Sequence, residues 1–258
     1  MTESGALCGY PRQVSADSWL PGPVIPSSWL AGAPTPWVWF AIAGLAAAAG
    51  SVLLALDRGQ RDAHLRERRR WAALRGWQFV SVDPALTDLW CHGVLARGGP
   101  GLARNLVAGT LFSPLGRRMV QVFDHEQDGQ VSGVVVAVQR RAPATELVVE
   151  LWLPDRASPS DPSLVRLGPM GDRVALVSDP DQAAPLVTDE LVFAANALGR
   201  DVPVAWLEQD WVLAAAPCAA TPARLERLLR ALDETADLLD AAELDTTAEL
   251  ADFFRPSQ

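Results

Sequence analysis

The chain contains no lysine, and all 22 of its basic residues are arginine. A phosphate-binding loop of the GxxxxGK[ST] type is therefore excluded, because that loop requires its lysine. The GxSxG pattern that places a nucleophilic serine on a strand-to-helix turn is also absent. Alanine, glycine, proline and valine are abundant, and we attribute the use of arginine in place of lysine to codon bias in a GC-rich genome.

Cysteine and histidine are also scarce, with three residues each. Cys8, Cys91 and Cys218 show no CxxC spacing, so they form neither a zinc-binding pattern nor a disulfide framework. Cys91 and His92 are adjacent rather than spaced as metal ligands, and we assign them no role. The sequence therefore predicts no metal and no cofactor.

Charge is unevenly distributed along a chain whose formal net charge is −9. Residues 57–75 carry seven arginines and three acidic residues, whereas the residues from 76 onward carry a net charge of −12. Nucleic acids are bound by basic surfaces, so this acidic region argues against nucleic acid as a partner.

Residues 37–56, WVWFAIAGLAAAAGSVLLAL, contain no charged side chain. A helix rises about 1.5 Å per residue, so this segment would span about 30 Å, the thickness of the hydrocarbon core of a bilayer. We predict a single transmembrane helix, with Trp37 and Trp39 at the membrane interface. A cleaved signal peptide is disfavoured by the polar stretch that precedes the segment, and a buried core helix is the remaining alternative.

The arginines that follow this segment predict its orientation. Basic residues near membrane ends favour the cytoplasmic side, so we expect the N-terminus outside and the C-terminal domain in the cytoplasm. We also expect part of this cluster to contact anionic lipid headgroups at the membrane surface. The alternative is that the cluster only sets the topology. The candidate contact residues are Arg66, Arg68, Arg69, Arg70 and Trp71.

Composition and hydrophobic periodicity divide the chain into five regions. They are a disordered, Pro/Ser/Gly-rich extracytoplasmic segment at 1–36, the transmembrane helix at 37–56, an Arg-rich juxtamembrane helix at 57–75, a cytosolic α+β domain at 76–241 and an acidic tail at 242–258.

Within the domain, period-two patterns predict antiparallel strands at 77–82, 105–112, 118–125, 131–139, 146–153, 173–177, 202–207 and 211–216. The four from 105 to 153 are expected to form a meander. Helices are predicted at 188–198 and from Thr221, where the second places six apolar side chains on one face: Leu225, Leu228, Leu229, Leu232, Ala236 and Leu239. This mostly antiparallel β-meander with two packed amphipathic helices is compatible with a pleckstrin-homology-like domain.

The strongest cluster of titratable residues is Asp124, His125 and Glu126. On a strand, Asp124 and Glu126 share one face and His125 points to the other, so the geometry separates them. We assign no catalytic residue. The acidic residues between Asp233 and Asp252 are expected to form a solvated face and tail, or else to dock a basic partner or fold back onto residues 66–70.

The apolar span followed by RERRRWAALRGWQFVSVDPAL and ARNLVAGTLFSPLGRRMVQVFDH resembles a group of uncharacterised single-pass membrane proteins from GC-rich Gram-positive bacteria of the actinobacterial type. The resemblance implies a membrane-anchored cytosolic α+β domain and transfers no catalytic residue. We therefore predict a non-catalytic interaction or scaffold domain with an unknown protein partner. Alternatives are an accessory subunit of a membrane transport or secretion complex, and a membrane-tethered hydrolase or sensor with a site near Asp124, His125 and Glu126.

Overall fold

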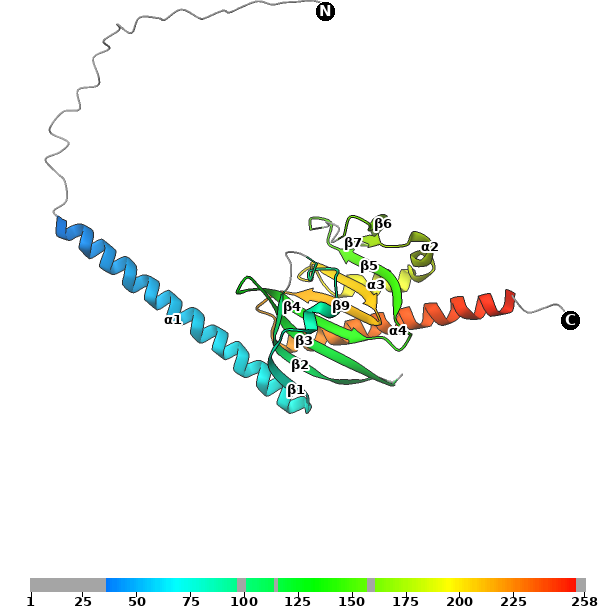
Figure 1. Cartoon of the computed structure of the whole chain (residues 1–258), viewed down its shortest axis with the longest axis horizontal. Coiled ribbons are helices and arrows are strands. Elements are labelled where there is room, and N and C mark those ends of the chain that lie inside the picture. The colour runs from blue at the N-terminus through cyan, green and yellow to red at the C-terminus, as the bar shows by residue number, and fades with distance from the viewer. Residues whose placement is uncertain (1–35, 97–100, 114–115, 157–160, 254–258) are drawn as a thin grey trace, which may run out of the picture. The chain divides into compact units, whose positions relative to one another are not determined.

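The computed structural model describes residues 36–96, 101–113, 116–156 and 161–253 (Figure 1). The chain divides into two units, residues 1–56 and residues 57–258. The disorder predicted for the N-terminal segment concerns residues that, up to 35, lie outside the described part of the chain.

The described part of the first unit is the beginning of helix α1 (Pro36–Arg75). Its large apolar side chains are exposed, among them Trp37, Trp39, Phe40, Leu45 and Leu53. Across the residues that the structure describes, no helix is both long enough and apolar enough to cross a membrane. The transmembrane helix predicted at 37–56 is thus not shown.

The second unit is an α+β domain built on one large antiparallel sheet. Its strands are β1 (Gln78–Asp83), β2 (Leu102–Ser113), β3 (Gly116–Gln127), β4 (Gln130–Gln139), β5 (Thr145–Trp152), β6 (Val165–Met170), β7 (Arg173–Val177), β8 (Val204–Gln209) and β9 (Trp211–Ala216). Its helices are the end of α1, the 3₁₀ turns η2 (Leu86–Leu89) and η3 (Ala184–Leu186), and α2 (Pro180–Ala183), α3 (Asp189–Ala197) and α4 (Pro222–Phe253).

The order of the described strands differs from the predicted meander. It is β1-β2-β3-β4-β9-β8-β5-β7-β6, with antiparallel neighbours throughout. Strands β2 to β4 are consecutive as expected, but the β8–β9 hairpin lies between β4 and β5. The four-strand meander is therefore wrong at its last step, because strand periodicity locates a strand without specifying its partner. The open nine-stranded order also departs from the seven-stranded pleckstrin-homology-like arrangement.

Local turn chemistry explains the hairpin between β3 and β4. Asp128 and Gly129 connect β3 to β4 with φ values of 51° and 75°. Positive φ at both central residues is required by the type I′ turn, which matches the twist of the strands it joins. The pairing of β3 with β4, which the predicted meander includes, is confirmed.

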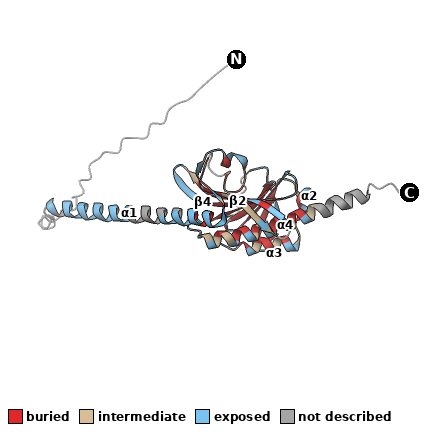
Figure 2. Cartoon of the chain, turned by 90° about the horizontal axis from the view of Figure 1, so that it is seen from below, coloured by how far each residue is buried: buried red, intermediate tan, exposed pale blue. Residues whose placement is uncertain are grey.

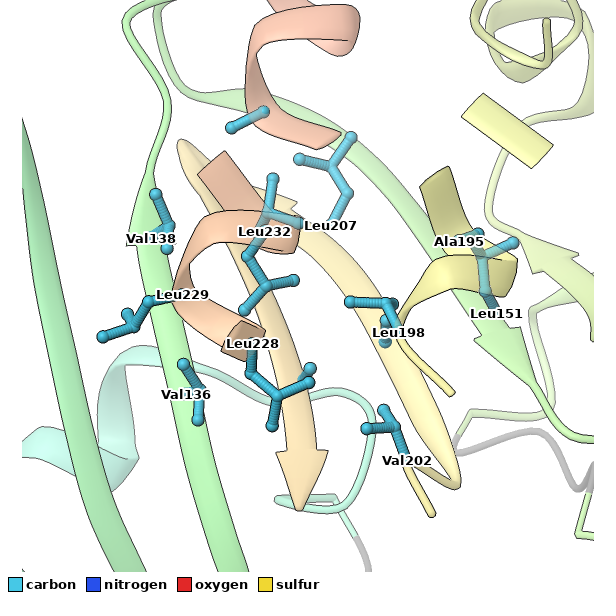
Figure 3. Close-up of a cluster of buried hydrophobic side chains, with 14 of the residues drawn as sticks. Val136, Val138, Leu151, Ala195, Leu198, Val202, Leu207, Leu228, Leu229 and Leu232 are labelled. Carbon is cyan, nitrogen blue, oxygen red and sulfur yellow. The ribbon is translucent and has the colours of Figure 1, made fainter. Parts of the chain in front are cut away.

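Both faces of the sheet carry buried apolar side chains. One face packs against α3, α4 and the last turns of α1, and the other is covered by the segment that contains η2 and Trp90. Figure 3 shows α4 side chains Leu228, Leu229 and Leu232 among residues from the sheet and the α3 region. All six apolar residues predicted on one face of this helix are buried. In Figure 2, buried residues gather in the sheet and along the helices packed on it.

The acidic side of α4 docks onto buried arginines of the sheet. Arg118 forms ion pairs with Asp233 at 3.0 Å and with Asp240 at 2.8 Å, and Arg140 pairs with Asp240 at 3.1 Å. The expectation that this acidic run folds onto residues 66–70 is wrong for these described side chains, because their cations come from β3 and the end of β4. Helix α4 also continues through the boundary predicted at 241/242, and the side chains after 243 lie outside the described set.

Candidate functional site

A cleft of about 490 Å³ lies where the second unit's part of α1 meets β2, β3 and the turn before α4. Its volume is in the range of small-molecule sites. Polar and apolar side chains contribute to its wall, namely His64, Leu65, Glu67, Arg68, Arg104, Asn105, Asp124, Glu126, Gln130, Val131, Cys218, Ala219, Ala220 and Pro222.

An irregularity in β2 places two polar residues at this cleft. The register between β2 and β3 shifts between Arg104 and Val107, and Asn105 has a φ of 51°. Asparagine tolerates this left-handed conformation better than most residues, and bulges of this kind redirect side chains next to functional sites. The Asn105 amide nitrogen donates a hydrogen bond to Asp124 Oδ2 at 2.8 Å.

Two ion pairs form in the wall of the cleft. Arg68 of α1 pairs with Asp124, and Arg104 pairs with Glu126. The Arg68 and Asp124 side chains are largely buried, so this pair fastens α1 to the sheet. With Glu67 the wall carries three carboxylates against two guanidiniums, so the cleft has no excess positive charge to attract an anion. Its hydrogen-bonding groups suit a neutral polar ligand.

His125 lies on the other face of β3, as the strand geometry predicts. It is buried, and its Nδ1 is 2.9 Å from Ser132 Oγ. Burial lowers the pKa of His125 below its usual value. The three members of the Asp124-His125-Glu126 cluster therefore do not converge, and no group of residues arranged to hold a metal occurs among the described side chains. This arrangement gives no support to the hydrolase alternative.

The residues predicted to contact the membrane surface fall into two groups. Trp71 is buried, stacks edge to face on Trp77 at 5.3 Å and donates from Nε1 to Glu226 Oε1, so it holds the end of α1 against α4. Arg68 is similarly buried in its pair with Asp124. The remaining residues, Arg66, Arg69 and Arg70, are exposed, with the Arg69 guanidinium 4.9 Å from the Phe79 ring centroid. Membrane contact stays a prediction for these three.

Cys91 and His92, for which no role is predicted from the sequence, belong to a second polar site on the face of the sheet opposite the cleft. Glu208 accepts hydrogen bonds from the Cys91 amide at 2.7 Å and from His92 Nδ1 at 2.9 Å. Glu150, which is fully buried, accepts from the Gly93 amide at 2.7 Å. The Glu208 contact raises the pKa of His92 above its usual value.

This second site holds residues 91–93, the covering loop, against the sheet, because the two glutamates accept hydrogen bonds from backbone amides of that loop. The signal that could have revealed it is a lone glutamate inside each of two apolar strands, VVELW and VAWLEQ. Buried carboxylates are rarely left without partners, so each glutamate predicts a polar group above it.

The antiparallel sheet and the helices packed on it define an α+β domain with a polar cleft, and in the sequence this domain follows an exposed apolar helical segment. The chain belongs to the family of the trehalose monomycolate transport factor TtfA, whose sequence profile matches residues 35–251. The match includes all of α1 and all but the last two residues of α4.

Two relatives agree with this assignment. The chain is 28% identical over 200 residues to trehalose monomycolate transport factor A of Mycolicibacterium smegmatis, covering 78% of this chain and 69% of that protein. The crystal structure of the mycobacterial transport factor A, TtfA, superposes with a TM-score of 0.61 at 27% identity, covering 68% of this chain and 93% of that one. The expected resemblance to actinobacterial proteins is confirmed at this coarser level, whereas the description of the group as uncharacterised is replaced by a named family.

Proposed function

We propose that this protein is a non-catalytic, membrane-associated accessory factor in the transport of trehalose monomycolate. The observation that carries the proposal is the family match, which extends from the start of α1 to the last turns of α4. The alternative of an accessory subunit for transport therefore takes precedence over a general scaffold. The ion-paired Asp124 and Glu126 side chains of the cleft and their separation from His125 also favour binding over chemistry.

We further propose that residues 37–56 hold the protein in the membrane, with the second unit on the cytoplasmic side. The exposed side chains of Trp37, Phe40 and Leu45 would be covered there by lipid or by a membrane protein. The arginines at 66, 69 and 70 would lie near anionic headgroups, where each contributes about 1 kcal/mol.

Depletion of the protein in the bacterium that encodes it tests the transport role. We expect trehalose monomycolate to accumulate at the cytoplasmic membrane and to decrease in the outer envelope, as measured by lipid extraction of separated fractions. Wild-type protein should restore the distribution, and so should His125→Gln at matched abundance, because the role requires no catalytic histidine. An unchanged glycolipid distribution after depletion would overturn the proposal.

Membrane attachment is tested separately by deleting residues 37–56. The shortened protein should leave the membrane fraction, and reporters fused to the two ends of the full chain should report the N-terminus outside and the C-terminus inside. Replacing Arg66, Arg69 and Arg70 by Gln should weaken binding to vesicles that contain anionic lipid, without affecting vesicles of phosphatidylcholine alone.

A further inference from the structure

Helices α3 and α4 pack against each other on one face of the sheet, and a shallow groove of about 580 Å³ follows their outer surface. Apolar and acidic side chains line this groove. The apolar ones are Phe193, Ala194, Ala197 and Leu238, and the acidic ones, named here the acidic rim, are Asp189, Glu190, Glu234 and Asp237.

Phe193 is the most exposed large hydrophobic side chain in the described part of the chain, at 78%. Its neighbours Leu191, Ala194 and Ala195 are buried against the rest of the domain, whereas Phe193 belongs to neither apolar core. An aromatic ring on the solvent side of a helix adds little to the stability of the fold. Rings of this kind, surrounded by polar residues, are typical of the centres of protein interfaces.

The charges of the groove indicate the chemistry of the partner that it would bind. Asp237 is paired with Arg118 and Arg141, but among the described residues Asp189, Glu190 and Glu234 form no ion pair. Asp189 and Glu190 also lie in the first turn of α3, where the helix dipole favours them. Glu234 lies within α4, away from the first turn, so the helix dipole does not stabilise its charge in the same way. An anionic lipid surface would be repelled by this rim, and a cationic segment would be attracted to it.

We propose that the α3–α4 groove is a docking site for a basic amphipathic helix of a membrane-protein partner. The apolar stripe of such a helix would cover Phe193, and its Lys and Arg side chains would flank Glu190 and Glu234. Cytoplasmic segments of membrane proteins carry an excess of Lys and Arg, so this chemistry is common next to a bilayer. The inference rests on the proposed function for the location of the domain at the cytoplasmic face.

The test uses the full chain in phosphatidylcholine nanodiscs and a fluorescent 18-residue amphipathic peptide of leucine and lysine, with empty nanodiscs as the blank. By fluorescence anisotropy, we expect Phe193→Ser to weaken binding at least tenfold. The double variant Glu190→Arg/Glu234→Arg should do the same and should reduce the dependence of Kd on salt. The matched controls Phe112→Ser and Asp155→Arg, which also change exposed residues, should stay within twofold of wild type.

Equal weakening by Phe193→Ser and Phe112→Ser, or an unchanged Kd for the charge-reversed variant, would overturn the inference. So would self-association of the full chain that is lost with Phe193→Ser, because the groove would then hold a second copy. A depletion experiment without effect on trehalose monomycolate would contradict the proposed function alone, since the groove is measured with a peptide. If the peptide does not bind but depletion still alters the distribution of the glycolipid, only the docking proposal is contradicted.

Discussion

Trp71 Nε1 donates a hydrogen bond to Glu226 Oε1 at 2.9 Å, which joins the end of α1 to the beginning of α4. Arg75 contacts the same carboxylate, with Nη2 at 2.7 Å from Oε1. The last two turns of α1 are thus part of the folded domain.

Removing the Trp71 side chain should weaken this junction. We expect Trp71→Ala to lower the free energy of unfolding by about 3–5 kcal/mol, because a buried aromatic ring is lost. Trp71→Phe keeps a ring beside Trp77 but removes the N–H group, so it should cost about 1.5–3 kcal/mol. Urea unfolding of the full chain in detergent, followed by circular dichroism, measures both.

Leu74→Ala is the matched control for these variants, since Leu74 lies on the same helix and is exposed. It should change stability by less than about 0.5 kcal/mol. A similar loss of stability in Leu74→Ala and Trp71→Ala would contradict the role of Trp71 in joining α1 to α4.

The contacts with Trp71 and Arg75 lower the pKa of Glu226, so the stabilisation from this group is present at neutral pH and is lost as the pH falls through that lowered pKa.

Arg118 should be the most sensitive position of the α4 docking network. Its side chain is completely buried, and Arg118→Met leaves Asp233 and Asp240 without this shared cation. We expect a loss of about 3–5 kcal/mol in the free energy of unfolding at pH 7. The adjacent Arg117→Met, at an exposed position, should cost less than about 0.5 kcal/mol.

The deficit of Arg118→Met should shrink in acid. Burial, followed by the charge of Asp237, already raises the pKa of Asp233. Without Arg118 this pKa should rise further, so the folded variant takes up protons more readily than the unfolded chain and gains stability as the pH falls. A deficit that is equal at pH 4 and pH 7 would show that the lost stability comes from packing alone.

The two histidines on the face of the sheet that η2 covers should have pKa values shifted in opposite directions. The Glu208 hydrogen bond raises the pKa of His92, and burial lowers the pKa of His125. In an NMR titration of the ring protons, the His92 midpoint should lie above about 6.5 and the His125 midpoint below it.

The His92 shift has a consequence for stability. Its contribution is fully present below the unfolded pKa and is lost as the pH rises through the raised folded pKa. Hydrogen exchange at the amides of residues 91–93 should therefore accelerate more between pH 6 and pH 8 than chemical exchange predicts. His92→Gln should remove this excess, and an excess that persists in His92→Gln would assign it to another group.

Local sequence patterns predicted most strands and the apolar face of α4, because period and capping are encoded within a few residues of each element. Strand β6 was missed since its sequence VRLGPM contains glycine and proline. Proline is tolerated at this place because β6 is the last strand of the sheet, where a backbone donor is not required on the outer side. The insertion of β8 and β9 next to β4 was missed because pairing depends on contacts between residues far apart in sequence.

The candidate cleft was predicted only in part. Strand alternation correctly placed Asp124 and Glu126 on one face and His125 on the other. Their partners Arg68 and Arg104 could not be predicted, since each guanidinium reaches its carboxylate only after α1 and β2 pack beside β3. The same reason explains why Arg68 was expected at a lipid surface: in the sequence, it stands within a run of arginines and nothing distinguishes it from Arg66 or Arg70.

Gly93 and Gly129 both have positive φ but differ in the space around them. Gly93 has a φ of 63°, and a Cβ atom there would lie 2.6 Å from the Trp206 ring. Gly129 has a φ of 75° with open space around it. Gly129→Ala should cost about 1–2 kcal/mol, the price of a left-handed conformation for an L-residue.

Gly93→Ala should cost more, about 3 kcal/mol, because the methyl group displaces a buried ring in addition to the backbone strain. Urea unfolding gives both values, and hydrogen exchange at residues 91–93 locates the change. Local exchange should increase in Gly93→Ala but not in Gly129→Ala, since the Gly93 amide donates a hydrogen bond to the buried Glu150 carboxylate. Equal losses in the two variants would mean that Trp206 moves freely, and the two glutamates would then not hold the covering loop in one position.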